Sequence, residues 1–169
     1  MLETQAEENK ILESKSIENM IYEISGKQVM LDSDLAKLYQ CKNGTKEINQ
    51  AVKNNPDKFP ERYSWVLSDK ELNNLWSKNL TANISNMSRV NPRVFTEQGI
   101  AMLATILHTK VATEVSICIM DTFIKMRHFI NENKDVFKSL NNINTMVLEH
   151  DSKINEIFDR FDKKDNYPL

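Results

Sequence analysis

The chain is poor in the two residues that most often interrupt regular secondary structure. It has three glycines and four prolines in 169 residues. A many-stranded barrel or sandwich needs frequent turns, so this scarcity argues against those folds and favours helix. The two cysteines, Cys41 and Cys118, form neither a C-x-x-C pair nor a disulfide framework. We expect one thiol in a turn and one small buried hydrophobic residue.

Long apolar runs are also missing. No stretch reaches the roughly 18 residues that a membrane-spanning helix needs. The first nineteen residues are acidic and lack the basic start and apolar segment of a signal peptide. We therefore expect a cytoplasmic protein with no membrane association, in a bacterium or a phage-infected cell.

Signatures of catalysis are absent from the sequence. The three histidines, His108, His128 and His150, are 20 and 22 residues apart and lack the spacing of metal ligands. There is no glycine-rich phosphate loop and no G-x-S-x-G motif. Glu97 is interpreted as a first-turn carboxylate favoured by the helix dipole rather than as a general base. We expect no enzyme, no cofactor and no metal.

The charge is unevenly distributed, although the formal net charge is only −2. Residues 26–110 carry twelve bases and eight acids, a balance of +4. Residues 1–25 have a balance of −4 and residues 111–169 a balance of −2. A basic middle between acidic flanks is compatible with a module that faces phosphates, but it does not require one.

The basic segment begins with a predicted β-hairpin and two predicted helices. "IYEISGKQVML" (residues 21–31) indicates two strands around Gly26. Asp32 is a candidate N-cap for a helix over residues 33–40, and Thr45 for a helix that ends near Asn54. "CKNG" separates the two helices, and Ala36 is small enough for close helix packing. The second helix would bury Ile48, Ala51 and Val52.

This pair has the anatomy of a helix-turn-helix, with donors and acceptors on the outer side of its second helix. Asparagine and glutamine can bind adenine, and lysine can reach guanine or phosphate. The residues predicted to face base edges are Thr45, Lys46, Asn49 and Gln50. The residues predicted to position phosphates are Lys53, Lys58 and Arg62, with Lys78, Arg89 and Arg93 as a candidate second basic arm. Asn54 is also expected to face outward on this helix and is included in the predicted DNA-binding set. Double-stranded DNA is the expected partner.

Further strands and helices are predicted downstream. Residues 63–67 indicate a strand, and "SDKE" has the capping-box pattern of a helix start at Ser68. Residues 77–92 are polar and predict an exposed loop or hairpin arm. A strand is expected over residues 93–95, and a helix opened by Thr96 should follow.

The last third carries a heptad repeat, and no glycine or proline occurs between Gly99 and Pro168. The upstream frame runs through Val115, Ile119, Met126 and Phe129. The predicted dimerisation seam consists of Val136, Leu140, Ile143, Val147, His150, Ile154, Ile157 and Phe161. Such a period favours a coiled coil and a homodimer or higher homo-oligomer. The alternative is one long helix that folds back on the domain.

Three blocks in this order resemble a known family. "VMLDSDLAKLY", "INQAVKNNPDKFPERYSWVLSDKE" and "VFTEQGIAMLATIL" are similar to the ORF-6-N domain, which is related to the KilA-N and Bro-N domains. The similarity spans Ile17 to Arg127. It implies a helix-rich α+β domain with small β-hairpins around a helix-turn-helix-like unit, acting as a DNA-binding regulator of phage or prophage. "VFTEQGIAML" is interpreted as a structural block.

This chain departs from the family pattern in places. Gln40 and the longer "CKNG" stand where the family has a glycine and a short turn. The family's basic "K-R-N" corresponds to residues 53–55, so Asn54 replaces an arginine and lacks its charged fork. The family's "R-F-P" corresponds to residues 58–60. The altered turn at Gln40 and the loss of the arginine at position 54 both weaken the expectation of strong phosphate contact.

Four segments follow from these patterns: an acidic lead (1–16), the ORF-6-N domain (17–130), a coiled-coil helix (131–164) and a tail (165–169). The favoured function is a dimeric DNA-binding transcriptional regulator. The alternative is an antirepressor that sequesters a repressor or another protein on its long helix.

Overall fold

The computed structural model describes residues 16–78 and 90–164, with side chains as far as residue 160. Nearly all of the predicted acidic lead, most of the predicted loop over residues 77–92, and the tail lie outside the described residues. The chain divides into two compact units, Met1–Lys125 and Met126–Leu169. Each unit is described by itself below.

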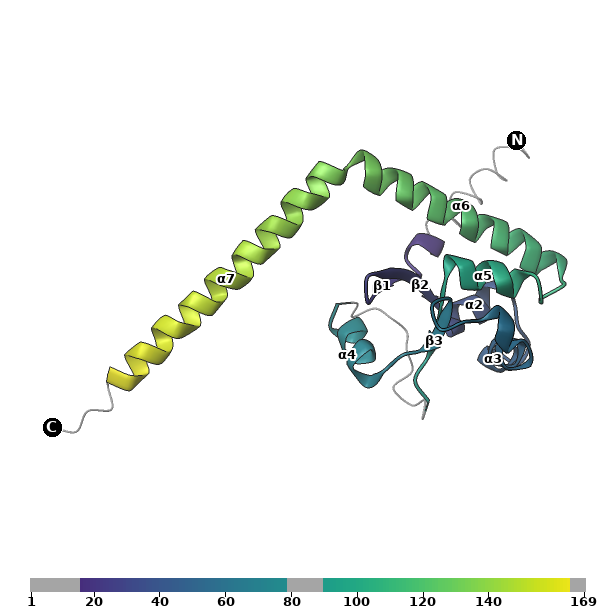
Figure 1. The fold of residues 1–169 in the computed structure, drawn as a ribbon, viewed down its shortest axis with the longest axis horizontal. Helices are drawn as coiled ribbons and strands as arrows, with labels where there is room; N and C mark the ends of the chain where they lie inside the picture. The colour runs from purple at the N-terminus through teal and green to yellow at the C-terminus, as the bar shows by residue number, and fades with distance from the viewer. Residues whose placement is uncertain (1–15, 79–89, 165–169) are drawn as a thin grey trace. The chain divides into compact units, whose positions relative to one another are not determined.

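The first unit is built on one four-stranded antiparallel sheet (Figure 1). The strand order is β1-β2-β4-β3, so β4 pairs with both β2 and β3. The predicted β1–β2 hairpin is present, and Ser25 and Gly26 take positive φ angles of 52° and 74° at its turn. The strands are β1 (Ile21–Ile24), β2 (Lys27–Leu31), β3 (Ser64–Val66) and β4 (Arg93–Thr96).

Helices cover both faces of the central strands. Met30 and Phe95 lie opposite each other and join a core with α2, α3, α5 and the helix α6 (Lys110–Glu132), which contributes residues from Ala112 to Phe123. Leu31 and Val94 face the other way and join a smaller core with α4. A strand buried on both faces is apolar throughout rather than alternating, as the buried residues 29–31 of β2 are. The short helices are α2 (Asp32–Leu38), α3 (Thr45–Asn54), α4 (Asp69–Lys78), α5 (Glu97–Ala104) and the 3-10 turn η1 (Pro56–Lys58).

Two predicted helix caps are wrong by one residue. The N-cap of α2 is Leu31, and Asp32 is the first helical residue, with Oδ1 accepting a hydrogen bond from the backbone N–H of Ser33 at 2.9 Å. The N-cap of α3 is Gly44 rather than Thr45. Gly44 has φ +59°, a conformation that suits glycine far better than threonine, so the turn decides the position of the cap.

The two other predicted helix starts are confirmed. Ser68 and Glu71 form a reciprocal capping box: Ser68 N donates to Glu71 Oε2 at 3.0 Å, and Glu71 N donates to Ser68 Oγ at 3.3 Å. Thr96 caps α5, with its hydroxyl oxygen accepting from Gly99 N.

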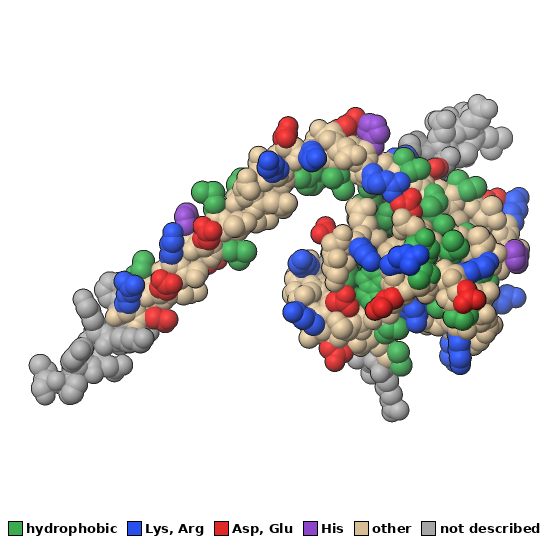
Figure 2. All heavy atoms as spheres, viewed as in Figure 1, with side chains coloured by type: hydrophobic (Ala, Val, Ile, Leu, Met, Phe, Trp, Pro, Cys, Tyr) green, Lys and Arg blue, Asp and Glu red, His purple; other side chains and the backbone are tan. Residues whose placement is uncertain are grey.

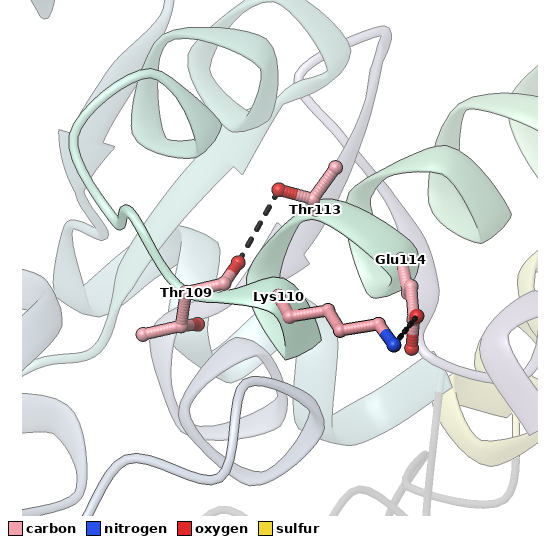
Figure 3. A network of polar contacts seen from close by, with 4 residues as sticks. All are labelled: Thr109, Lys110, Thr113 and Glu114. Carbon is pink, nitrogen blue, oxygen red and sulfur yellow. Dashed lines mark hydrogen bonds and ion pairs between the residues drawn. The ribbon is translucent and has the colours of Figure 1, made fainter.

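Figure 3 shows the start of the first long helix, α6, where the Thr109 carbonyl accepts a hydrogen bond from the Thr113 hydroxyl and Lys110 pairs with Glu114. Thr109 Oγ1 accepts from the N–H of Ala112 at 3.0 Å, and the Thr109 carbonyl accepts from the Thr113 hydroxyl at 3.2 Å. Lys110 pairs with Glu114 one turn on, at 3.8 Å. Ile119 is buried in the core of the first unit and Val115 packs against that core, so these two residues of the upstream heptad frame belong to the domain core. Phe129, further along the frame, is exposed.

A second long helix, α7 (Lys134–Lys164), follows, so the helical C-terminal part consists of two helices. The two helices are separated at Asn133. Asn133 uses both its backbone N–H and its side-chain Nδ2 as donors to the carbonyl of Phe129, at 3.1 and 2.9 Å. Phe129 and Phe137 pack edge to face across the break, with ring centroids 6.1 Å apart.

Candidate nucleic-acid interface

The second helix of the predicted helix-turn-helix, α3, is fixed by its apolar side. Ile48, Ala51 and Val52 are buried, as predicted from their helical spacing. Ala36 of α2 is also buried in the same core, so the two helices pack closely where a small residue permits it. This packing leaves the opposite side of α3 to solvent.

The exposed side of α3 carries three long polar side chains in one stripe. Lys46, Gln50 and Lys53 are exposed and spaced i, i+4 and i+7, which places them above one another on the helix. Gln50 Nε2 donates to Asn54 Oδ1 at 2.7 Å, so Asn54 borders the stripe. Thr45, in the first turn, is half-buried. We call Lys46, Gln50 and Lys53 the α3 stripe.

Asn49 does not belong to the α3 stripe. It is half-buried, and its Nδ2 donates to Asp32 Oδ2 at 2.9 Å and to the carbonyl of Thr45 at 3.0 Å. Its Oδ1 accepts from Arg93 Nε at 3.1 Å. Both donors of the amide are thus used inside the protein. The expectation that Asn49 points outward with an amide open to a base does not hold in this structure.

Arg93 likewise points into the protein. Its Nε reaches Asn49, and its Nη1 donates to the hydroxyl of the buried Ser64 at 3.2 Å. Burial lowers the pKa of Arg93, while the negative charge of Asp32 raises it. Arg93 therefore lies in a polar cluster with Asp32, Asn49 and Ser64 rather than in an exposed basic arm.

The other predicted phosphate contacts are scattered over the domain. Lys58 Nζ donates to the hydroxyl of Thr105, just after α5, at 3.0 Å. Lys78 is exposed at the end of α4, the helix that packs on the other face of the sheet from α3 (Figure 1). Arg89 lies outside the described residues. The structure thus groups only part of the predicted set on α3.

Arg62 is grouped with a residue that the sequence had not singled out. Lys27 and Arg62 both line two open hollows, of about 580 and 630 Å³. Lys27 Nζ lies 5.3 Å from the centroid of the Trp65 ring, and Arg62 Cζ lies 5.1 Å from that of Tyr63. Glutamates line these hollows as well, so their charge is mixed.

Asp32 and Ser64 were also missed as partners of the candidate site. Asp32 had been assigned a capping role, and Ser64 is an inconspicuous residue in a short strand. Asn49 and Arg93 are 44 residues apart, and no local spacing pattern relates them. The available signal was weaker: Asp32 directly follows the apolar run of residues 29–31, and Arg93 directly precedes two apolar residues of β4.

The seam predicted on α7 is open to solvent. Hydrophobic side chains are visible along this helix (Figure 2). All seam residues with a described side chain are exposed: Val136, Leu140, Ile143, Val147, His150, Ile154 and Ile157. The side chain of Phe161 is not among those described. Four further hydrophobic residues of α7 with described side chains are exposed but lie outside the two heptad positions that form the seam: Phe137, Met146, Leu148 and Phe158.

Three further features of the described part of the chain concern metal ligands, thiols and helix length. No group of three or more histidine, cysteine, aspartate or glutamate residues there is arranged to hold a metal ion. Both cysteines are free, and burial, aided by the neighbouring Glu47, raises the pKa of Cys41 to about 11, so the thiol stays protonated at neutral pH. Within residues 16–78 and 90–164, no helix is both long and apolar enough to span a membrane.

Comparison with known proteins identifies the domain that holds these residues. The family model described as "ORF6N domain" matches residues 19–106, which include the sheet, α2, α3, α4 and α5. No curated protein and no solved structure matches the chain. Because the family match covers more than half of the 169 residues, the resemblance found in the three sequence blocks is confirmed, and the chain belongs to the ORF6N-domain family.

Proposed function

We propose that the protein is a sequence-specific DNA-binding transcriptional regulator of phage or prophage type, which reads DNA with α3 and dimerises through α7. The observation that carries this proposal is the α3 stripe. Lys46, Gln50 and Lys53 are exposed on one line while the opposite side of the helix is buried. Because these three side chains are exposed, they do not serve as buried polar contacts within the domain.

The dimensions and chemistry of α3 suit a major groove. Ten residues make a helix about 15 Å long, and the major groove is about 12 Å wide. Glutamine at position 50 has a donor and an acceptor for adenine, and the two lysines can reach guanine or phosphates. The N–H groups in the first turn, at Thr45, are suited to a backbone phosphate. Lys58 and Arg62 would add phosphate contacts.

Dimerisation through α7 supplies the second reading helix. A solitary helix cannot bury a seam of seven exposed residues, so association with a second copy is the natural way to remove them from water. The seam keeps its seven-residue period for almost four heptads. Two copies of α3 would then read a roughly palindromic site whose half-sites are separated by whole helical turns.

A second candidate function is sequestration of a repressor by α7. Phe137, Met146, Leu148 and Phe158 favour it, because a two-stranded coiled coil leaves such positions at its margin or uncovered. A partner helix of amphipathic character could cover them. In this case the protein would act on transcription without touching DNA.

Selection from random oligonucleotides, followed by fluorescence anisotropy on the selected duplex, tests DNA reading. If the dimer contacts about six phosphates, log K should fall with log[salt] with a slope of roughly −5. Enrichment of one sequence together with this salt dependence is expected. A flat salt response and an unselected pool would count against DNA binding.

Matched helix variants locate the reading surface. The triple variant Lys46→Ala, Gln50→Ala, Lys53→Ala removes the α3 stripe. Lys70→Ala, Asn74→Ala, Lys78→Ala removes two lysines and an amide from the exposed side of α4 at similar spacing. The first should abolish specific binding and the second should leave it nearly unchanged. Equal losses would overturn the assignment to α3.

The sequestration alternative predicts a different outcome. A repressor recovered with the tagged protein from a DNase-treated lysate, and lost on truncation before residue 134, would support it. The α3 triple variant should then retain the repressor as the wild-type protein does. A wild-type protein that recovers no repressor from the lysate and enriches no sequence from the oligonucleotide pool would contradict both functions.

A further inference from the structure

The cluster of Asp32, Asn49, Arg93 and Ser64 joins four different elements of the domain. Asp32 opens α2, Asn49 lies on α3, Arg93 opens β4 and Ser64 opens β3. Asp32 and Ser64 are buried to 6% and 3% exposure, so the two ends of the cluster are fixed in the interior. The middle members, Asn49 and Arg93, are half-buried at the edge of α3.

The hydrogen bonds of the cluster form one continuous path. Ser64 accepts from Arg93, Arg93 donates to Asn49, and Asn49 donates to Asp32, with distances of 3.2, 3.1 and 2.9 Å. Asp32 receives a further bond from the N–H of Ser33. The fork of an arginine is needed, because Nε and Nη1 bind two different acceptors at a fixed mutual geometry.

Such a path constrains α3 in a way that its apolar contacts do not. Burial of Ile48, Ala51 and Val52 is non-directional and tolerates a small rotation of the helix about its axis. Hydrogen bonds weaken steeply when they bend, so the bonds at Asn49 define one rotation. Asn49 lies one residue before Gln50, and the rotation that the cluster selects therefore also determines where Gln50 and its neighbours on the stripe point.

We propose that Arg93 and Asp32 are positioning residues for DNA recognition: with Asn49 they form a polar joint that sets the rotation of α3 and hence the register of the α3 stripe on the bases. This inference rests on the proposed function. It assigns Arg93 a role within the protein instead of a phosphate contact. Base contacts carry specificity and phosphate contacts carry mostly general affinity, so the two roles have separable consequences.

Arg93→Lys separates these roles, because it keeps the positive charge and removes the fork. If Arg93 positions α3, Arg93→Lys and Arg93→Met should both lower the ratio of specific to non-specific affinity, on the order of tenfold, with the salt slope unchanged. If Arg93 contacts a phosphate, Arg93→Lys should be nearly silent, and Arg93→Met should reduce the slope by about 0.9 per subunit.

Ser64→Ala is a second variant that keeps the charge of Arg93 and removes only the hydroxyl that accepts from its Nη1. It should shift the specificity ratio in the same direction as Arg93→Lys, by a smaller factor. Asp32→Asn retains an oxygen that accepts from Asn49 and should rescue much of what Asp32→Ala loses. Thermal unfolding of each full-length variant shows whether the fold is retained, and Arg127→Lys, a like change of an exposed arginine outside the cluster and the proposed DNA contacts, is the control.

The experiment is anisotropy with the selected duplex and a scrambled duplex, at four salt concentrations between 50 and 200 mM. A wild-type protein without preference for the selected duplex overturns the proposed function and the joint together. A specific wild-type protein whose preference survives both Arg93→Lys and Ser64→Ala overturns the joint alone. Loss of preference in a folded Arg93→Lys variant with an unchanged salt slope supports it.

Discussion

Gly99 and Tyr63 approach each other so closely that no other residue fits at position 99. A Cβ on Gly99 would lie 2.3 Å from the carbonyl oxygen of Tyr63 and 3.1 Å from the carbonyl carbon. The same oxygen accepts from the N–H of Thr96 at 2.9 Å and from its hydroxyl at 3.2 Å. The chain entering β3 is therefore held directly against the first turn of α5.

Gly99→Ala should destabilise the domain, although alanine is normally the better helix former by about 1 kcal/mol. The neighbour at 2.3 Å is backbone, so the clash can be relieved only by moving β3 or α5. We expect a loss of about 2–4 kcal/mol in the free energy of unfolding, measured by urea denaturation. Gly26→Ala, at φ +74° with open space around it, should lose about 1 kcal/mol. Equal losses would refute the close approach.

Asp34 should make the domain less stable as the pH rises. Burial raises the pKa of its carboxyl, the charge of Asp32 raises it further, and Lys37 opposes the shift. Among the described residues, Oδ2 of Asp34 has no hydrogen-bond partner. The folded state therefore keeps a proton at pH values above 3.8 at which the unfolded state has lost it, and stability falls as the pH rises through that window.

Asp34→Asn tests this prediction, because the amide does not titrate. The free energy of unfolding of the variant minus that of the wild type should increase between pH 4 and neutral pH, and then level off. Urea denaturation at pH 4, 5, 6 and 7 measures it. The difference between the two proteins removes contributions from other groups, such as Glu71, whose pKa is lowered chiefly by the backbone N–H of Ser68. A pH-independent difference would contradict the prediction.

The hydrogen bond between the hydroxyls of Tyr39, directly after α2, and Ser116 on α6 should contribute to the stability of the domain. The two oxygens are 2.9 Å apart, and both residues are buried. Tyr39→Phe and Ser116→Ala should each lower the free energy of unfolding by about 1–2 kcal/mol, since each leaves a buried hydroxyl without its partner. The double variant should lose less than the sum. Additive losses in this double-mutant cycle would show that the two hydroxyls do not interact.

The features that sequence predicted well depend on residues close together in the chain. The buried stripe of α3, the Ser68–Glu71 box and the Thr96 cap each involve a spacing of three or four residues, and all are confirmed. The displaced caps at Asp32 and Thr45 had the right chemistry, but the required backbone conformation fell on the preceding residue. Local sequence propensity predicts the first residue of a helix to within one or two positions. The backbone conformation of the preceding turn then determines which of these residues is the N-cap.

Distant pairings were beyond such patterns. β4 inserts between β2 and β3, a topology decided by burial of Phe95 and Val94 on opposite faces of the sheet. That insertion places Arg93 within hydrogen-bond distance of Asn49. The sequence alone predicts DNA contacts for both residues, because a polar residue on a helix or at a strand end gives the same pattern whether it faces DNA or another residue of the protein. Which polar residues meet inside the protein follows from the fold, and the fold depends on the whole core.

The polar residue in the α7 seam leads to a prediction about dimerisation. His150 occupies a seam position between Val147 and Ile154 and is exposed in the single chain. In the proposed dimer it would be buried against its counterpart, where leucine packs better and requires no hydrogen-bond partner. His150→Leu should therefore tighten self-association of the full-length chain, by roughly tenfold in Kd, as measured by sedimentation equilibrium.

His128→Leu is the matched control for this change. His128 lies off the seam, is exposed, and its Nδ1 is 3.2 Å from Oε1 of Glu132 one turn on, so its replacement adds the same apolar area at a position outside the proposed interface. It should leave the association constant unchanged within about twofold. Tightening by both variants would indicate non-specific hydrophobic association. Weakening by His150→Leu would mean that the histidine makes a polar contact across the dimer, and the packing of the seam would have to be assigned anew around that contact.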